Sequence, residues 1–114
     1  MEQLKREVIQ FRDLRNWKQF HDIKNLSMGM SVEAAELQEL FLWKTSAEID
    51  AMLASQKDRK RIEEECADVF VFLLYLAEAA GLDLSAAVRD KLVINGRKYP
   101  VEKSYNSSKK YTEL

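Results

Sequence analysis

Two pairs of acidic residues have the type and the spacing to act together on one ligand. Glu33 and Glu36 are three residues apart, and Glu65 and Asp68 repeat this spacing further along the chain. Because residues three apart lie on the same side of an α-helix, each pair places two carboxylates on one helix face. Apolar residues continue the same face in both segments, so we expect all four carboxylates to face inward.

Carboxylates on an inward face must meet cations if they are to stay ionised, because an unpaired buried carboxylate is strongly destabilising. Arg61 and Lys44 are placed to neutralise one charge each, and the remaining charge favours a divalent metal ion. Ligation by oxygen alone suits Mg²⁺ first and Mn²⁺ second. A di-iron centre is excluded, since it needs Glu-x-x-His pairs and the one histidine, His21, has no glutamate three residues before it.

The alternative for each acidic pair is a solvated helix face or an interaction with the helix dipole. One such pair alone would favour that alternative, whereas two pairs on apolar stripes leave both interpretations open. A Mg²⁺ ion held by a few carboxylates keeps coordination positions for water and for substrate phosphates. Such a site polarises phosphoryl oxygens and supplies an activated water, so the predicted chemistry is metal-assisted hydrolysis of a phosphorylated ligand.

The elements that would position these residues are helices. Apolar residues recur at helical spacing over most of the chain. There are 3 glycines and 1 proline, where an average chain of this length would carry about 13 of the two together. Thr45 and Glu48 have capping-box spacing, Gly81 suits a helix C-terminus, and Pro100 ends the last helix. The predicted fold class is all-α. Helices are expected at 4–17, 26–44, 47–54, 57–80 and from a cap at Asp83 or Ser85 to Lys98, with a connector at 18–25 and a surface-lying or mobile tail at about 100–114.

The length of 114 residues predicts a single domain, 1–114. From Cys66 to Ala80 only Asp68 and Glu78 are charged, and apolar residues occur on every side of that helix. A helix that is apolar all around must be covered all around. We therefore expect a four- to five-helix bundle subunit that completes its core by homo-oligomerisation. A monomer with an unusually apolar central helix is the alternative.

The charge balance and the lone cysteine exclude some classes of binding partner and some kinds of site. The chain has 18 Lys+Arg against 19 Asp+Glu, which gives no general attraction to nucleic acid or to an anionic membrane. A single cysteine, Cys66, excludes an internal disulfide and a cysteine-built zinc site. The charged start is unlike a signal peptide, and the longest apolar run, Val69–Ala77, is well short of the roughly 20 residues of a membrane span. We expect a cytoplasmic protein with neither nucleic acid nor membrane as a partner.

The acidic pairs and their surroundings resemble the MazG-like all-α nucleoside triphosphate pyrophosphohydrolases. The signature of that family is ExxE, a spacer and ExxD, and here 28 residues separate the two pairs. Further blocks are similar to the dCTP pyrophosphatase branch of the family, and the resemblance covers nearly the whole chain. These blocks are NWKQFH at 16–21, Asn25-Leu26, ELFLWK at 39–44 and KLVINGRKYP at 91–100.

The resemblance implies a house-cleaning hydrolase that cleaves a deoxynucleoside triphosphate, dCTP or a related one, to the monophosphate and pyrophosphate. It implies Mg²⁺ as cofactor and assembly as a homodimer or a dimer of dimers, with sites built across subunits. It assigns metal binding and catalysis to Glu33, Glu36, Glu65 and Asp68, with one of the glutamates as a candidate base. It assigns binding of the base and sugar to Trp17, Phe20, His21, Asn25 and Trp43. It assigns binding of the phosphates and the nucleoside to Lys91, Asn95, Lys98 and Tyr99, and a further substrate contact to Lys44.

Alternatives remain open at this stage. Trp43 suits a core position equally well, and His21 suits a hydrogen-bonded connector position better than a catalytic one. The alternative function is a non-catalytic helical module that binds nucleotide or only assembles, and it predicts no metal-dependent turnover. A nucleic-acid-binding regulator is disfavoured by the balanced charge and by the lack of a basic recognition helix.

Overall fold

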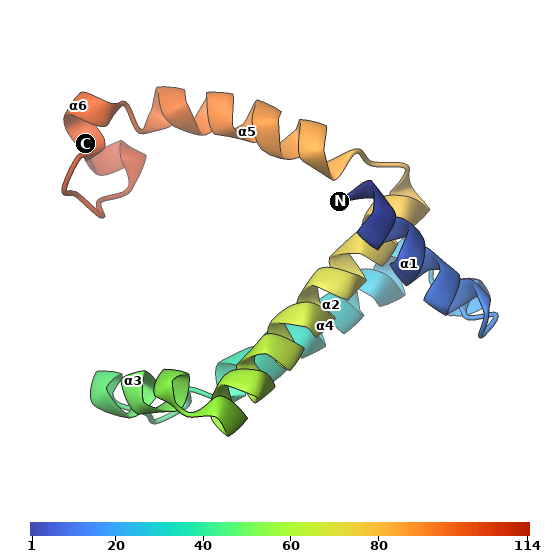
Figure 1. The fold of residues 1–114 in the computed structure, drawn as a ribbon. Coiled ribbons are helices and arrows are strands. Elements are labelled where there is room, and N and C mark those ends of the chain that lie inside the picture. Colours follow the sequence, from blue (N-terminus) through green and yellow to red (C-terminus); the bar gives the residue numbers. More distant parts are fainter. The chain divides into compact units, whose positions relative to one another are not determined.

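The structure is a computed structural model that describes residues 1–114, and it is all-helical, as predicted (Figure 1). The chain divides into two compact units, 1–81 and 82–114. The first holds α1 (Glu2–Asp13), the 3-10 turn η1 (Lys18–Phe20), α2 (Ile23–Glu39), α3 (Ser46–Ala54) and α4 (Gln56–Ala80). The second holds α5 (Leu84–Lys98), α6 (Val101–Ser104) and the 3-10 turn η2 (Tyr111–Glu113).

Short polar side chains start the main helices, because each satisfies a free backbone N–H of the first turn. The Asp22 carboxylate accepts a hydrogen bond from the backbone N–H of Asn25 at 2.8 Å. Thr45, Ser55 and Asp83 cap α3, α4 and α5 in the same way. Gly81 ends α4 in the left-handed conformation, with φ of 67°, which glycine adopts without a steric penalty.

Two predicted helices are shorter at their C-termini than the sequence pattern suggested. The first ends at Asp13 rather than near residue 17, because the backbone N–H of Trp17 turns back to the carbonyl of Arg12. The second spans 23–39 rather than 26–44. Its start is set by the Asp22 cap, and it cannot continue through Trp43, whose φ of 63° is left-handed.

The centre of the first unit is the antiparallel pair α2 and α4, which lie side by side along most of α2 (Figure 1). α1 and α3 each pack against α4, α1 toward its C-terminal end, where Lys5 pairs with Glu78 at 3.4 Å. The buried hydrophobic residues come from the paired helices: Leu26, Leu74, Tyr75 and Ala77. The pair therefore forms the core and also carries both acidic motifs.

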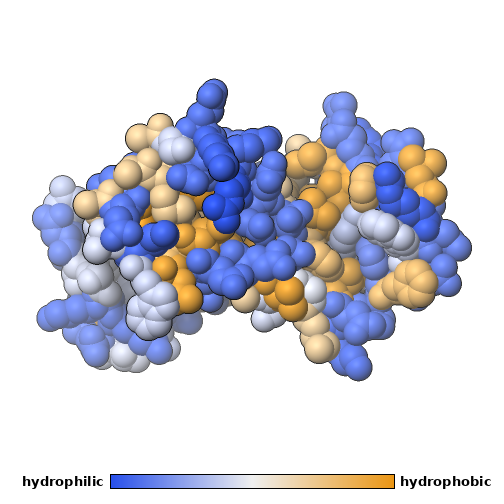
Figure 2. All heavy atoms as spheres, turned by 90° about the horizontal axis from the view of Figure 1, so that it is seen from below, coloured by the Kyte–Doolittle hydropathy of each residue, from blue (hydrophilic) through white to orange (hydrophobic).

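Many large apolar side chains remain at the surface, where Figure 2 shows hydrophobic residues among polar ones. In the first unit Leu14, Phe20 and Trp43 are among the most exposed. Exposed apolar surface on this scale is typical of an interaction surface. No single helix is long and apolar enough to cross a membrane, and only α4 and α5 taken together, as a bent pair, pass that test by length and composition.

In the second unit the tail turns back onto the end of α5. The rings of Tyr99 and Tyr111 meet edge to face at 6.0 Å, and the Lys98 ammonium lies 4.9 Å from the Tyr111 ring centroid. Pro100 both ends α5 and precedes the first turn of α6. The tail expected at about 100–114 is thus partly helical.

Candidate metal centre

The acidic pairs face each other across the α2–α4 contact. Gly29 of α2 lies against the ring of Phe72 of α4. Because the helices are antiparallel, one turn forward on α2 from Gly29 and one turn back on α4 from Phe72 bring Glu33 and Asp68 to the same level. One further turn brings Glu36 level with Glu65. The helix contact at Gly29 therefore sets how closely the four carboxylates approach.

Three of the four predicted ligands form one cluster. Glu33, Glu36 and Glu65 each offer a carboxylate oxygen, and these oxygens lie within 4.8 Å of one another. In Glu33 and in Glu65 the oxygen Oε2 is buried without a hydrogen-bond partner. Buried carboxylate oxygens without partners are strongly unfavourable, so the cluster is incomplete as protein alone. A hard divalent cation fits this all-oxygen donor set.

Asp68 stands beside this cluster rather than within it. Its side chain is exposed and lines an open cavity of about 330 Å³ together with Val8 and Phe11 of α1. Its negative charge nevertheless helps to raise the pKa of both Glu33 and Glu65. Asp68 is thus close enough to act on the cluster electrostatically, while the sequence predicted it as an equal member.

The cluster binds protons more tightly than isolated carboxylates do. Burial is the largest cause that raises the pKa of Glu33 to about 7, followed by hydrogen bonding and charge repulsion from Glu36. Burial and the charges of Glu36 and Asp68 also raise the pKa of Glu65. At neutral pH the metal-free cluster therefore carries bound protons that neutralise part of its negative charge. A metal ion would displace these protons.

An open cavity of about 420 Å³ adjoins the cluster and gives it access to solvent. Its lining includes the cluster members Glu36 and Glu65, together with Glu39, Leu40 and Arg61. The sequence predicted that Arg61 could neutralise one carboxylate, and the structure places it beside two of them. Lys44, the other predicted counter-charge, is exposed beyond the end of α2 and does not line this cavity.

The predicted aromatic residues lie outside the lining of this cavity. Trp43 is 91% exposed, so its interpretation as a core residue is wrong, and it lines a separate cavity at the end of α2. Phe20 is also exposed. Trp17 packs edge to face against Phe11, at 5.9 Å between ring centroids.

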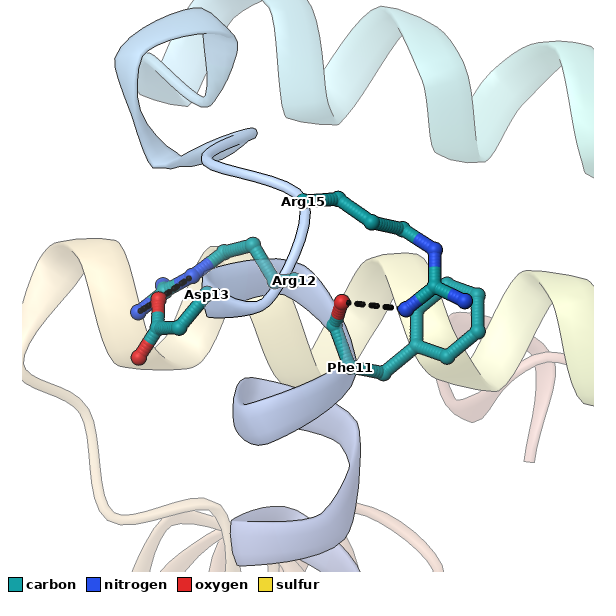
Figure 3. A network of polar contacts seen from close by, with 4 residues as sticks. All are labelled: Phe11, Arg12, Asp13 and Arg15. Carbon is teal, nitrogen blue, oxygen red and sulfur yellow. Dashed lines mark hydrogen bonds and ion pairs between the residues drawn. The ribbon is translucent and has the colours of Figure 1, made fainter.

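Arg15 stabilises the aromatic turn that holds Trp17. Its guanidinium lies 3.6 Å from the centroid of the Phe11 ring and donates a hydrogen bond to the Phe11 carbonyl oxygen, as Figure 3 shows. The neighbouring Arg12 is almost fully buried and pairs with the Asp13 carboxylate at 2.7 Å. The burial of this arginine was not predicted from the sequence, because a basic side chain on an amphipathic helix is normally exposed.

His21 and Asn25 each make contacts that stabilise the fold. The His21 ring lies 4.6 Å from that of the buried Tyr75, and its Nδ1 is buried without a partner. Burial and the Arg12 charge lower the pKa of His21, so its ring is neutral near pH 7. The Asn25 side chain donates to Asp22 at 2.7 Å, which completes the cap of α2.

The remaining predicted substrate residues lie in the second unit. Lys91, Asn95 and Lys98 are on α5, at spacing that places them along one face, and Tyr99 caps the helix C-terminus. Lys91 is exposed, while Lys98 and Tyr99 contact Tyr111. These four residues thus lie along the second half of α5 and at its C-terminal end.

Comparison with known proteins places this arrangement in a family. The MazG-like family matches residues 28–114, which include both acidic pairs. Human dCTP pyrophosphatase 1 is 40% identical over 114 residues, all of this chain and 67% of that protein, and the rat protein is 39% identical over the same share. A solved structure of a pyrophosphatase from Archaeoglobus fulgidus superposes with a TM-score of 0.80 at 42% identity, covering 88% of this chain and 92% of the other. The chain belongs to the MazG-like family.

Proposed function

We propose that this chain is a metal-dependent nucleoside triphosphate pyrophosphohydrolase. The observation that carries the proposal is the cluster of Glu33, Glu36 and Glu65, in which two buried carboxylate oxygens lack partners. The pyrophosphatase names of relatives that match all or most of the chain support the reaction class. Mg²⁺ is the proposed ion and Mn²⁺ its substitute, because all the donors are hard oxygens.

The residues of the cluster have distinct parts in the proposed reaction. Glu33, Glu36 and Glu65 would hold the metal, with Asp68 beside them, and the bound ion would neutralise charge on the phosphates and activate water. Burial and the neighbouring Glu36 raise the pKa of Glu33 to about 7 in the metal-free cluster, near the pH at which a general base works best. We assign to Glu33 the acceptance of the proton from the attacking water.

The proposed substrate is a deoxynucleoside triphosphate, dCTP or a close relative. The names of the mammalian relatives support this choice. Exposed Trp17, Phe20 and Trp43 offer aromatic surfaces on which a base can stack, and Lys91 and Lys98 can bind phosphates.

The reaction is tested by its products. With Mg²⁺ present, we expect dCTP to yield dCMP and pyrophosphate in equal amounts, separated by anion-exchange chromatography, because attack on the α-phosphate releases the two outer phosphates together. EDTA should abolish turnover, and added Mg²⁺ should restore it. Release of orthophosphate and a diphosphate would contradict the assigned bond, and nucleotide binding without turnover would favour a non-catalytic module.

We also propose that the chain assembles as a homodimer or homotetramer. The proposal is supported by the exposure of large apolar residues on α2, on α5 and around Trp43, including Val32, Leu92 and Val93. We expect sedimentation equilibrium at micromolar concentration to give a multiple of the 13.3 kDa chain mass. A mass of one chain at that concentration would refute this assembly.

A further inference from the structure

Arg61 is the one basic residue in the lining of the cavity beside the metal cluster. It lies on α4 one turn before Glu65, and the cavity lining also includes Glu36, Glu39 and Leu40. Its side chain is 58% exposed, and its ion pair, with Asp58, spans 4.0 Å. At that distance and exposure the pair is weak, so the Arg61 guanidinium is available to another anion.

The charge of the cavity requires such a cation if a polyphosphate is to enter. Glu36, Glu39 and Glu65 make its lining acidic, and Glu39 lies outside the metal cluster. A divalent ion held by Glu33, Glu36 and Glu65 offsets only part of the charge of its own ligands, and it leaves the Glu39 carboxylate without a partner. Guanidinium binds phosphate oxygens in a bidentate manner and stays protonated at every relevant pH.

The position of Arg61 along the helix pair indicates which phosphates it would reach. The level of Leu40 and Arg61 lies one helical turn beyond that of Glu36 and Glu65, and away from Glu33. One turn is about 5.4 Å, which is longer than a single P–O–P link and close to the span of two such links, from the first phosphate to the third. With the scissile phosphate at the metal cluster, the phosphates that leave lie next to Arg61.

We propose that Arg61 is a substrate-binding residue that contacts the two outer phosphates, those released as pyrophosphate, and that Glu39 opposes their binding. The proposal rests on the proposed function for the identity of the substrate. It differs from a simpler role in which Arg61 only neutralises Glu65 four residues later. In that simpler role, loss of Arg61 would change the affinity for Mg²⁺ and leave the affinity for phosphates unchanged.

The test compares Arg61→Met with Arg59→Met. Arg59 is a matched control on the same helix, because it is equally exposed, pairs with Glu63 at 3.7 Å and does not line the cavity. The readout is calorimetric binding of inorganic pyrophosphate in the presence of Mg²⁺, together with KM for the nucleotide. Arg61→Met should weaken pyrophosphate binding and raise KM about fivefold, while Arg59→Met leaves both unchanged.

Two further variants test the sign of the effect. Arg61→Lys should recover part of the lost affinity, because a point charge replaces the bidentate contact. Glu39→Gln should strengthen pyrophosphate binding about twofold to fivefold, since it removes a repelling charge outside the metal cluster.

Equal pyrophosphate affinities in Arg61→Met and Arg59→Met would overturn the proposal, as would weaker Mg²⁺ binding as the sole effect of Arg61→Met. Because pyrophosphate binding is scored without turnover, failure of the wild-type chain to hydrolyse any nucleotide is a separate result. That result would refute the proposed function. The calorimetric comparison of Arg61→Met with Arg59→Met would still show whether Arg61 binds pyrophosphate.

Discussion

Glu36→Gln is expected to lower kcat for the triphosphate about a thousandfold while the fold stays intact. Glu36 is the cluster member that raises the pKa of both Glu33 and Glu65, which shows that its charge acts on both helices. The amide has nearly the same shape, but it removes the negative charge that binds the metal. The variant should melt at or above the wild-type temperature, because the substitution removes repulsion among neighbouring carboxylates.

A matched variant controls for the loss of one acidic charge from the surface. Glu63 is an exposed glutamate on α4 and lies outside the cluster and its cavity. Glu63→Gln should keep the wild-type kcat in the same assay. More than a tenth of the wild-type kcat in Glu36→Gln, measured with saturating Mg²⁺, would show that Glu36 is not a required ligand.

Gly29→Ala is expected to destabilise the protein and to weaken metal binding together. A methyl group at Gly29 would meet Cε1 of Phe72 and lie 2.8 Å from Cζ and 3.0 Å from Cδ1. The ring would have to move or the helices to separate, which costs roughly 1–3 kcal/mol. Because Glu33 follows Gly29 by one turn, the same displacement should lower the affinity for Mg²⁺.

Gly96 provides the control for this substitution. It lies in α5, and a methyl group there meets no atom within 4 Å. Gly96→Ala should therefore stabilise the helix by about 0.5–1 kcal/mol, as expected for alanine in place of glycine in a helix interior. Urea denaturation of both variants measures the two changes, and addition of Phe72→Leu should partly rescue Gly29→Ala. Stabilisation by Gly29→Ala would contradict the close approach of α2 and α4 at this point.

Local signals in the sequence predicted the helices well. The capping box at Thr45, the glycine at 81 and the helical spacing of apolar residues act over a few neighbouring residues, so they are visible without a structure. Helix ends were less predictable where the helix stops at a residue whose type does not favour a helix end. Trp43 with its left-handed φ is the clearest case, since nothing in its type indicates such a conformation.

The candidate site was predictable as far as it depends on single helices. The spacing of Glu33 and Glu36, and that of Glu65 and Asp68, placed each pair on one face. The register between the helices was not predictable, because it depends on the contact of Gly29 with Phe72, which are far apart in the sequence. A glycine inside a helical pattern was the available signal for that contact. The register also places Arg61 in the cavity and leaves Asp68 beside the cluster.

The proposed hydrolysis depends most on the binding of a divalent ion by the three glutamates, and a calorimetric titration with Mg²⁺ at pH 6 and pH 8 measures this binding directly. The pKa of Glu33 is raised to about 7, so metal-free protein should lose stability as the pH rises through 7. Binding of Mg²⁺ should reverse this loss, release protons at pH 6 and be tighter at pH 8. We predict Mg²⁺ binding by the wild-type chain that Glu36→Gln abolishes. Absence of binding at pH 8, or equal binding by Glu36→Gln, would contradict the metal centre and the hydrolytic function built on it.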